Sequence, residues 1–221
     1  MKRKSRKIFV GMGLLIAFAL WTVLVCYVDV RAAGPQGSRV GFATLNRAFH
    51  SLTGTNMQLY EVTDWLGLVP IAVAFGFAVL GLLQLIKRKS LLKVDLDIIL
   101  LGAFYLVVIG VYILFELVVV NYRPVLIEGY LEASYPSSTT VLVMCVIPTG
   151  VRVLNARIRS KTAKRAVIAV AYAFVLFMVV GRLLSGVHWL SDIIGGALFS
   201  AGIDTLYFYL GTIFVPFLFY S

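Results

Sequence analysis

Charged residues are scarce in this chain, and their scarcity excludes an ordinary water-soluble fold. Asp, Glu, Lys and Arg together make up 14% of the 221 residues, whereas hydrophobic residues make up 61%. A soluble globular domain typically has roughly half apolar residues and about a quarter charged ones. Because a chain of this size cannot bury so large an apolar share, we expect much of its surface to face lipid.

Cysteine and histidine are also scarce, with two residues of each type. Cys26 and Cys145 lie far apart inside apolar runs, where we expect them to act as small buried hydrophobic residues. The sequence has neither a disulfide framework nor the Cys and His spacing of a metal site. It therefore predicts no metal and no cofactor.

Long apolar runs predict an all-α, polytopic membrane protein with six transmembrane helices, since a helix needs about 20 apolar residues to cross a bilayer. We expect the first run to be a retained helix, because no small-residue cleavage site follows it promptly. Residues 1–221 then form a single membrane-embedded domain, in which residues 29–65 are a structured loop at the membrane surface. The runs are 8–28, 66–86, 98–120, 139–154, 166–184 and 193–217.

The positions of the basic residues predict the orientation in the membrane. Most of the 20 Lys and Arg residues fall in segments 2–7, 87–93 and 152–165, which a six-span topology places on one face. The positive-inside rule makes that face cytoplasmic, together with both termini. The other loops would then face outside the cytoplasm, as in a multi-pass protein of the cell membrane. The net charge of +10 is explained by topology and anionic lipids, so we expect no nucleic-acid partner.

Three ionisable residues follow one another at the outer end of the fifth run. His188 and Asp192 are four residues apart, so on one helix they would share a face. The Asp192 carboxylate could then accept a hydrogen bond from one imidazole nitrogen and make the other more nucleophilic. Arg182 offers forked donors that suit a phosphate group. The alternative is an ordinary helix start, with Asp192 as a cap and Arg182 reaching the membrane surface.

Two more segments carry similar chemistry to the same predicted face. Arg123-Pro124 follows the third run, and Pro136-Ser137-Ser138-Thr139 begins the fourth run. Free amides and hydroxyls at a helix N-terminus can bind an anion, or the hydroxyls can simply cap the helix. Taken together with the His–Asp pair, these features predict a site that holds a tetrahedral oxyanion for attack by imidazole.

These segments resemble the motifs of the type 2 phosphatidic acid phosphatase superfamily of membrane lipid phosphatases, which are K-x6-R-P, P-S-G-H and S-R-x5-H-x3-D. The third motif is matched by Arg182, His188 and Asp192 with its spacing intact. The second is matched by residues 136–139, and the first by Arg123-Pro124. The resemblance therefore covers about residues 116–192, and the six predicted helices extend it to the whole chain.

The resemblance implies a metal-independent phosphatase for lipid phosphates or diphosphates, of the polyprenyl diphosphate, phosphatidylglycerophosphate or phosphatidate class. It makes His188 the nucleophile that forms a phosphohistidine and Asp192 the residue that orients it. It makes Arg123 and Arg182 the clamp on the phosphoryl oxygens. The rest of the phosphate cradle would be formed by Ser137, Ser138 and Thr139.

Three positions depart from the family motifs. Glu116 stands in place of the motif-one Lys, Thr139 in place of the motif-two His, and Gly181 in place of the motif-three Ser. That His is the general acid of the family, and losing a general acid typically costs about 10²–10⁴-fold in rate. A leaving phosphate needs the proton less than a lipid alkoxide does, because its second pKa is ~6. We therefore expect a diphosphate to suit this site better than a monoester.

Alternatives remain at several of these positions. Glu116 could replace the missing acid if burial raised its pKa, or it could pair with Arg123 or Arg182. The whole protein could instead be a catalytically impaired member that binds lipid phosphate as a sensor, a partner subunit or a lipid-handling component. Asp204 lies inside the sixth run, where we expect a hydrogen bond to a neighbouring helix, and we expect His50 to be a loop residue.

Overall fold

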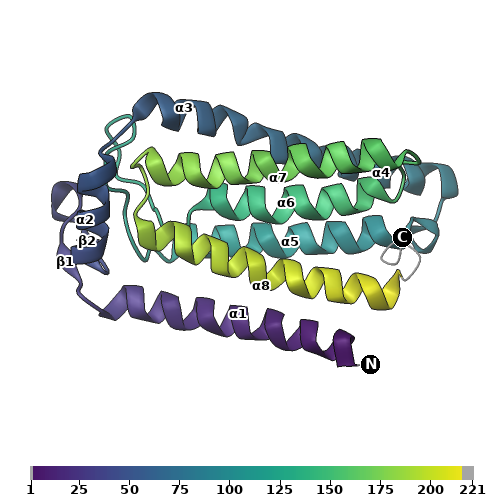
Figure 1. Ribbon diagram of the computed structural model, residues 1–221, viewed down its shortest axis with the longest axis horizontal. Helices are drawn as coiled ribbons and strands as arrows, with labels where there is room; N and C mark the ends of the chain where they lie inside the picture. The colour runs from purple at the N-terminus through teal and green to yellow at the C-terminus, as the bar shows by residue number, and fades with distance from the viewer. Residues whose placement is uncertain (1, 216–221) are drawn as a thin grey trace.

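The computed structural model describes residues 2–215, and six of the helices within them are long and apolar enough to cross a membrane. These helices run side by side as one bundle (Figure 1). The predicted all-α membrane fold is confirmed, with helix ends a few residues from those of the apolar runs. The helices are α1 (Lys2–Tyr27), α4 (Leu68–Arg88), α5 (Leu96–Leu117), α6 (Ser138–Asn155), α7 (Lys161–Leu184) and α8 (Leu190–Phe214).

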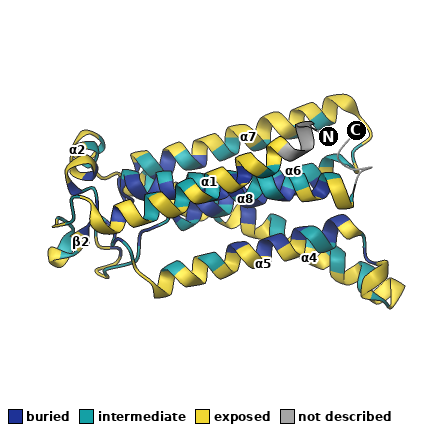
Figure 2. Ribbon diagram, turned by 90° about the horizontal axis from the view of Figure 1, so that it is seen from below, coloured by how far each residue is buried: buried dark blue, intermediate teal, exposed yellow. Residues whose placement is uncertain are grey.

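Helices α6 and α8 form the centre of the bundle. Helix α8 packs along α1 and α6, and α6 also contacts α4, α5 and α7. Figure 2 shows the buried residues gathered on these central helices, whereas the outer faces of α4, α5 and α7 are exposed. The exposed residues there are apolar, including Phe75, Leu106 and Val170, which are each about 70% exposed. Hydrocarbon, and not water, is the solvent that suits such a surface.

Glycines bring α1 and α8 into close contact. A Cβ atom placed on Gly202 of α8 would lie 2.9 Å from the Leu15 side chain and 3.2 Å from the Leu15 backbone nitrogen. A Cβ atom on Gly11 of α1 would lie 2.7 Å from the Leu206 side chain. Small residues at such positions let transmembrane helices approach closely and gain van der Waals contact.

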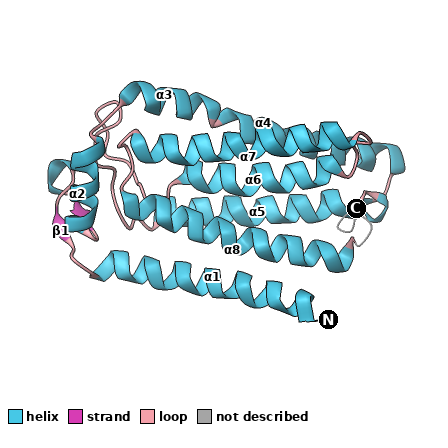
Figure 3. Cartoon of the chain, viewed as in Figure 1, coloured by secondary structure: helices cyan, strands magenta, loops and turns pink. Residues whose placement is uncertain are grey.

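Residues 29–66 fold mainly into helices, so the prediction of a loop in this segment is wrong. A small antiparallel hairpin, β1 (Arg31–Ala32) and β2 (Arg39–Val40), encloses the short 3-10 helix η1 (Pro35–Gly37). Two helices follow, α2 (Ala43–Thr53) and α3 (Met57–Leu66), and α3 continues through Gly67 into α4. Figure 3 shows that this segment and the long loops gather at one end of the bundle.

The basic connections lie at the other end, where α1 begins and α8 ends (Figure 1). The α4–α5 connection contains the short 3-10 helix η2 (Leu91–Lys93) and Asp95, whose carboxylate is 2.7 Å from Arg88 and 3.5 Å from Arg157 of the α6–α7 connection. The hydrogen bond from Arg88 lowers the pKa of Asp95. The two basic connections are therefore held together, and their cytoplasmic location stays a prediction.

Two expectations about residues inside the spans have mixed outcomes. Cys145 is buried as expected, but Cys26 is exposed on α1, so the expectation of a buried Cys26 is wrong. The Oδ1 atom of Asp204 is buried and has no hydrogen-bond partner among the described residues, so the expected hydrogen bond to a neighbouring helix stays a prediction.

We expect Gly202→Leu to lower the thermal unfolding temperature of the purified protein in detergent. The new side chain would meet the backbone of α1 at Leu15, and overpacking of this kind typically costs ~1–3 kcal/mol. Gly13→Leu is a matched control on α1, because a Cβ atom there has no heavy atom within 4 Å. Equal unfolding temperatures for the two variants would contradict the close contact between α1 and α8.

Candidate functional site

Four segments far apart in the sequence meet at the end of the bundle that carries α2. Arg123 comes from the linker 118–137, Thr139 from the first turn of α6, and Arg182 from the last turn of α7. His188 comes from the turn before α8. All four side chains are buried. The structure thus brings together residues that the sequence analysis placed in separate outer segments.

The Arg182 guanidinium group is fixed in the middle of the site. Its Nη2 atom donates to the Thr139 hydroxyl at 2.7 Å and to the Asp64 carboxylate at 2.7 Å. Its Cζ atom lies 4.9 Å from the centre of the Tyr60 ring. Its buried Nε and Nη1 atoms have no hydrogen-bond partner among the described residues. Arg182 is therefore held on one side and keeps donors on the other.

Arg123 shares the Tyr60 ring with Arg182. The Arg123 Cζ atom is 5.9 Å from the ring centre, and its Nε atom is 3.0 Å from the Glu132 carboxylate. The Arg123 backbone also donates to the Glu132 carbonyl at 3.0 Å. Its Nη1 atom is buried and has no hydrogen-bond partner within residues 2–215. Two guanidinium groups with donors to spare thus converge on one aromatic ring.

His188 and Asp192 do not share a helix face, so that prediction is wrong. His188 lies in the turn that precedes α8, whereas Asp192 lies in the first turn of α8 and caps it by accepting from the Trp189 N–H at 3.0 Å. The Asp192 carboxylate also accepts from Ser134 Oγ at 2.5 Å and from Asn121 Nδ2 at 3.0 Å. The predicted direct hydrogen bond between His188 and Asp192 is replaced by contacts through Ser134.

The His188 ring is held from one side only. Its Nδ1 atom is 3.0 Å from Ser134 Oγ and 3.2 Å from the Ser134 carbonyl oxygen. Its Nε2 atom is buried and has no hydrogen-bond partner in the described part of the chain. Burial holds the pKa of His188 well below its usual value, and the positive charges of Arg123 and Arg182 lower it further. The ring is therefore neutral at neutral pH and has a free nitrogen lone pair for attack.

The start of α6 differs from the predicted cradle at one residue. The Ser137 amide donates to the Asp192 carbonyl oxygen at 3.1 Å, so the prediction that it binds phosphate is wrong. The Ser137 hydroxyl accepts from Thr140 at 3.1 Å. The amides of Ser138, Thr139 and Thr140 belong to the first turn of α6, where no carbonyl group one turn earlier accepts from them, and the first helical bond is from the Val141 amide to Ser137. These three amides are the donors that the helix N-terminus offers.

Glu116 does not meet either expectation for it. Its side chain is exposed, so burial does not make it an acid, and the two site arginines pair with Glu132 and Asp64 instead. It lines the same cavity as His188 and Thr139.

A cavity of about 590 Å³ leads from the site into the bundle between α4, α5 and α6. Its polar end contains His188, Ser134 and Thr139. Along α6 it continues as far as Val146, which is about 12 Å from Ser138 at the rise of an α-helix. Most of its wall is apolar, with lining residues that include Leu68, Ile71, Val108, Ile109, Phe115 and Leu142. The cavity therefore joins a polar site to a space that suits a hydrocarbon chain.

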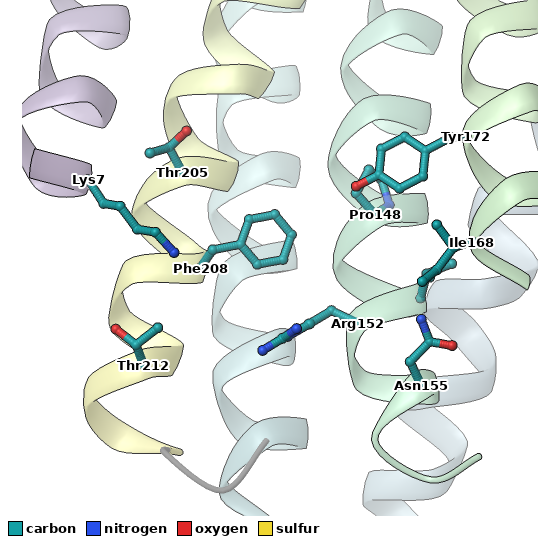
Figure 4. A pocket seen from close by; sticks show the side chains of 10 residues that line it. Lys7, Pro148, Arg152, Asn155, Ile168, Tyr172, Thr205, Phe208 and Thr212 are labelled. Carbon is teal, nitrogen blue, oxygen red and sulfur yellow. The ribbon is translucent and has the colours of Figure 1, made fainter. Parts of the chain in front are cut away.

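A second cavity, of about 460 Å³, lies between α6, α7 and α8 at the basic end of the bundle. Figure 4 shows Lys7 and Arg152 among its lining side chains, together with Phe208 and Tyr172. None of the residues predicted for the phosphate site lines it.

Comparison with known proteins agrees with this arrangement. The model of the PAP2 superfamily matches residues 118–214, which include the linker, α6, α7 and α8. No curated protein sequence matches the chain.

The PAP2 fold extends beyond the matched residues. The chain is similar to a crystal structure described as that of the first transmembrane PAP2 type phosphatidylglycerolphosphate phosphatase from Bacillus subtilis. The TM-score is 0.64 at 16% sequence identity, and the similarity covers 93% of this chain and 96% of the other. At this identity the similarity shows that the two chains share a fold. The cap formed by α2 and α3 and the helices α4 and α5 therefore belong to the same fold as the matched region.

Several residues of this candidate site were not predicted from the sequence. Tyr60 and Asp64 come from α3, and Asn121 and Ser134 come from the linker. Their only sequence signal is position: Asn121 precedes the Arg123-Pro124 motif closely, and Ser134 precedes the Pro136 motif closely. Tyr60 and Asp64 have no such neighbour, because α3 reaches the site through tertiary packing against α7.

His50 also contacts the site, although it was expected to be a loop residue. It lies in the last turn of α2, and its Nε2 atom is 3.1 Å from the Gly186 carbonyl oxygen. Its ring centre is 5.6 Å from that of Trp189. The loop expectation is therefore wrong, and His50 contacts the turn that carries His188.

The donor set of the site suits an anion. Its nitrogen donors are the guanidinium groups of Arg123 and Arg182 and the first amides of α6, in a buried setting that strengthens charge-assisted hydrogen bonds. Among the described residues, no group of three or more His, Cys, Asp or Glu side chains could hold a metal ion. The arrangement can therefore bind a phosphoryl group and present it to His188 Nε2.

We expect Asn121→Ala to destabilise the protein by about 1–3 kcal/mol, because it would leave buried groups without partners. The Asn121 side chain accepts from the Gly41 amide at 3.0 Å and donates to Asp192 at 3.0 Å, so it joins the outer hairpin to the site. Thermal unfolding in detergent measures the change. Gln58→Ala is the control, since Gln58 is an exposed amide residue on α3. A loss no larger than that of the control would contradict this role.

Proposed function

We propose that the chain is a metal-independent phosphatase that hydrolyses lipid phosphates or diphosphates through a phosphohistidine at His188. The observation that carries this proposal is the buried Nε2 atom of His188, which has no hydrogen-bond partner among the described residues, in a site where two arginines keep spare donors. The PAP2 match and the fold of a phosphatidylglycerolphosphate phosphatase support it. Phosphoryl transfer needs mainly positioning and charge stabilisation, and this site supplies both.

The first step transfers the phosphoryl group to the imidazole. The Nε2 lone pair attacks phosphorus, the P–N bond forms, and the bond from phosphorus to the leaving oxygen breaks. Arg123 and Arg182 stabilise the charge on the non-bridging oxygens, as preorganised donors do in many transferases. The Nδ1 proton stays on the ring and holds it against Ser134.

The second step returns the histidine to its starting state. Water attacks the phosphorus of the phosphohistidine, the P–N bond breaks, and the water proton passes to the released phosphate. The electron pair of the P–N bond returns to Nε2. Atoms and charge balance over the two steps, and the net reaction is hydrolysis of one phosphate bond.

The apolar cavity between α4, α5 and α6 indicates that the substrate is a lipid. A phosphoryl group at His188 would place the attached chain along the wall that includes Ile71, Val108 and Leu142. The hydrocarbon chain of the lipid could enter from the bilayer without crossing water, because α4 and α5 have apolar outer faces. We infer a polyprenyl diphosphate, phosphatidylglycerophosphate or phosphatidate as the substrate class.

A diphosphate is the substrate that the altered acid position favours. Thr139 stands where the family has its acidic His, and its hydroxyl accepts from Arg182. Asp64, which accepts from the same Arg182 nitrogen as Thr139, forms an ion pair with Arg182. At neutral pH a leaving phosphate depends less on receiving a proton than a leaving alkoxide does. The site would accordingly release phosphate as a leaving group more readily than an alcohol.

The location that we propose is the cell membrane, with the site on its outer face. The two basic connections and the start of α1 lie at the end of the bundle opposite to the start of α8, which His188 precedes (Figure 1). Basic loops favour the cytoplasmic side. Both termini would then be cytoplasmic, and the enzyme would act on lipids of the outer leaflet.

We expect the purified protein to release phosphate from at least one lipid in a panel of polyprenyl diphosphate, phosphatidylglycerophosphate and phosphatidate. His188→Ala should reduce release to background, because it removes the attacking atom. Arg47→Ala, on the exposed surface of α2, is a control for a general effect of substitution in this region.

No release above the His188→Ala background on any lipid would contradict the proposed enzyme. It would favour the alternative of a catalytically impaired family member that binds lipid phosphate. Binding of the same lipids to the wild-type protein would then identify that alternative.

We also expect Thr139→His to raise hydrolysis of phosphatidate relative to the diphosphate. A His at the start of α6 would supply a proton to the leaving alkoxide, and a general acid is typically worth about 10²-fold or more. Ser138→His is the matched control, because it places the same side chain one residue away. An unchanged substrate ratio in Thr139→His would show that the missing acid does not set the preference.

A further inference from the structure

Ser134 occupies a position between the proposed nucleophile and the carboxylate expected to orient it. Its hydroxyl is 2.5 Å from Asp192 Oδ2 and 3.0 Å from His188 Nδ1, and its carbonyl oxygen is 3.2 Å from the same nitrogen. We propose that Ser134 is a positioning residue that fixes the proton of His188 on Nδ1 and transmits the influence of Asp192. The catalytic part of this inference rests on the proposed function.

The direction of each hydrogen bond follows from what each atom can do. A carbonyl oxygen can only accept, so the contact with the Ser134 carbonyl requires a proton on His188 Nδ1. The Asp192 carboxylate accepts hydrogen bonds from several donors, and the Ser134 hydroxyl is one of them. The Ser134 hydroxyl oxygen then offers only lone pairs to Nδ1. Both oxygens of Ser134 thus favour the same tautomer.

This tautomer leaves Nε2 as the bare nitrogen. Nε2 is buried and has no hydrogen-bond partner among the described residues, and the positive charges of Arg123 and Arg182 both act on the ring. If the proton moved to Nε2, that nitrogen would lose its free lone pair. The position of one proton, held by Ser134, therefore decides whether His188 can attack.

The linker holds Ser134 by a small antiparallel pairing. Tyr122 pairs with Ala133, the Ser134 amide donates to the Asn121 carbonyl at 2.9 Å, and the Arg123 amide donates to the Glu132 carbonyl. Ser134 is 2% exposed, so its contacts are shielded from water. The same pairing holds both Arg123 and Ser134. It therefore sets the distance between the Arg123 guanidinium group, which would bind the phosphate, and His188, which Ser134 contacts.

The presence of two histidines in the whole chain makes a direct test practical. In full-length protein labelled with ¹⁵N-histidine in lipid nanodiscs, His50→Asn identifies the signals of His188. We expect His188 to show a protonated Nδ1 and an unprotonated Nε2. Ser134→Ala should shift the ring toward a mixture of tautomers, since only the longer carbonyl contact remains. Ser134→Thr keeps the hydroxyl and should restore the wild-type spectrum.

Ser200→Ala is the matched control, because Ser200 is a buried serine of α8 whose hydroxyl donates to the Gly196 carbonyl. It should leave the His188 signals unchanged. A protonated Nε2 in the wild-type protein, or an unchanged His188 spectrum in Ser134→Ala, would overturn the inference.

The catalytic consequence is measured separately. We expect Ser134→Ala to lower kcat about tenfold or more with little change in KM, as loss of a partner that orients a functional histidine typically does. Ser134→Thr should recover most of the rate. If the wild-type protein hydrolyses no lipid, the proposed function fails, and the tautomer spectra still decide the role of Ser134.

Discussion

Burying a carboxylate is costly unless hydrogen bonds replace the water it loses, and the Asp192 side chain is fully buried. Donors from two parts of the chain contact it: the Trp189 amide before α8, and the side chains of Asn121 and Ser134 in the linker. Its backbone carbonyl accepts from Ser137 at the start of α6. The start of α8, the linker and the start of α6 are thus joined at one residue.

The contacts around Asp192 also position the two arginines of the site, Arg123 and Arg182. The linker that contacts Asp192 also carries Arg123, and α6 carries Thr139, which accepts from Arg182. Buried cations need partners, and here the partners are only partly buried: the side chains of Asp64 and Glu132 are 56% and 42% exposed. The arginines therefore keep donors for a further anion. In the proposed function, a phosphoryl group would accept hydrogen bonds from these donors.

The composition and motif spacing predicted much of this architecture. Apolar runs predict spans because each span must bury its own backbone polar groups in lipid, whatever its neighbours do. The motif residues Arg123, Arg182 and His188 were predicted because their spacing places them near the ends of successive spans. The spacing of the motif residues does not predict how the chain folds between the spans. Helices α2 and α3 have only 11 and 10 residues, so neither contains an apolar run long enough to predict a span on its own.

The position of His188 also depends on how the chain folds between two spans, here α7 and α8. The four-residue spacing of His188 and Asp192 suggested one helix, but Gly186 has a positive φ of 66° and α8 begins only at Leu190. His188 is therefore turned toward the linker, where Ser134 contacts it. Contacts between residues far apart in sequence, such as Asp64 with Arg182, have no local pattern to reveal them.

The central claim is that His188 attacks phosphorus, and trapping the intermediate tests it most directly. The protein would be mixed with polyprenyl diphosphate labelled with ³²P in its terminal phosphate, quenched within one turnover and digested. The account predicts an acid-labile, base-stable label on the peptide that contains His188, and none in His188→Asn. Turnover with no label on that peptide, or a label on a serine or threonine of residues 137–139, would contradict it.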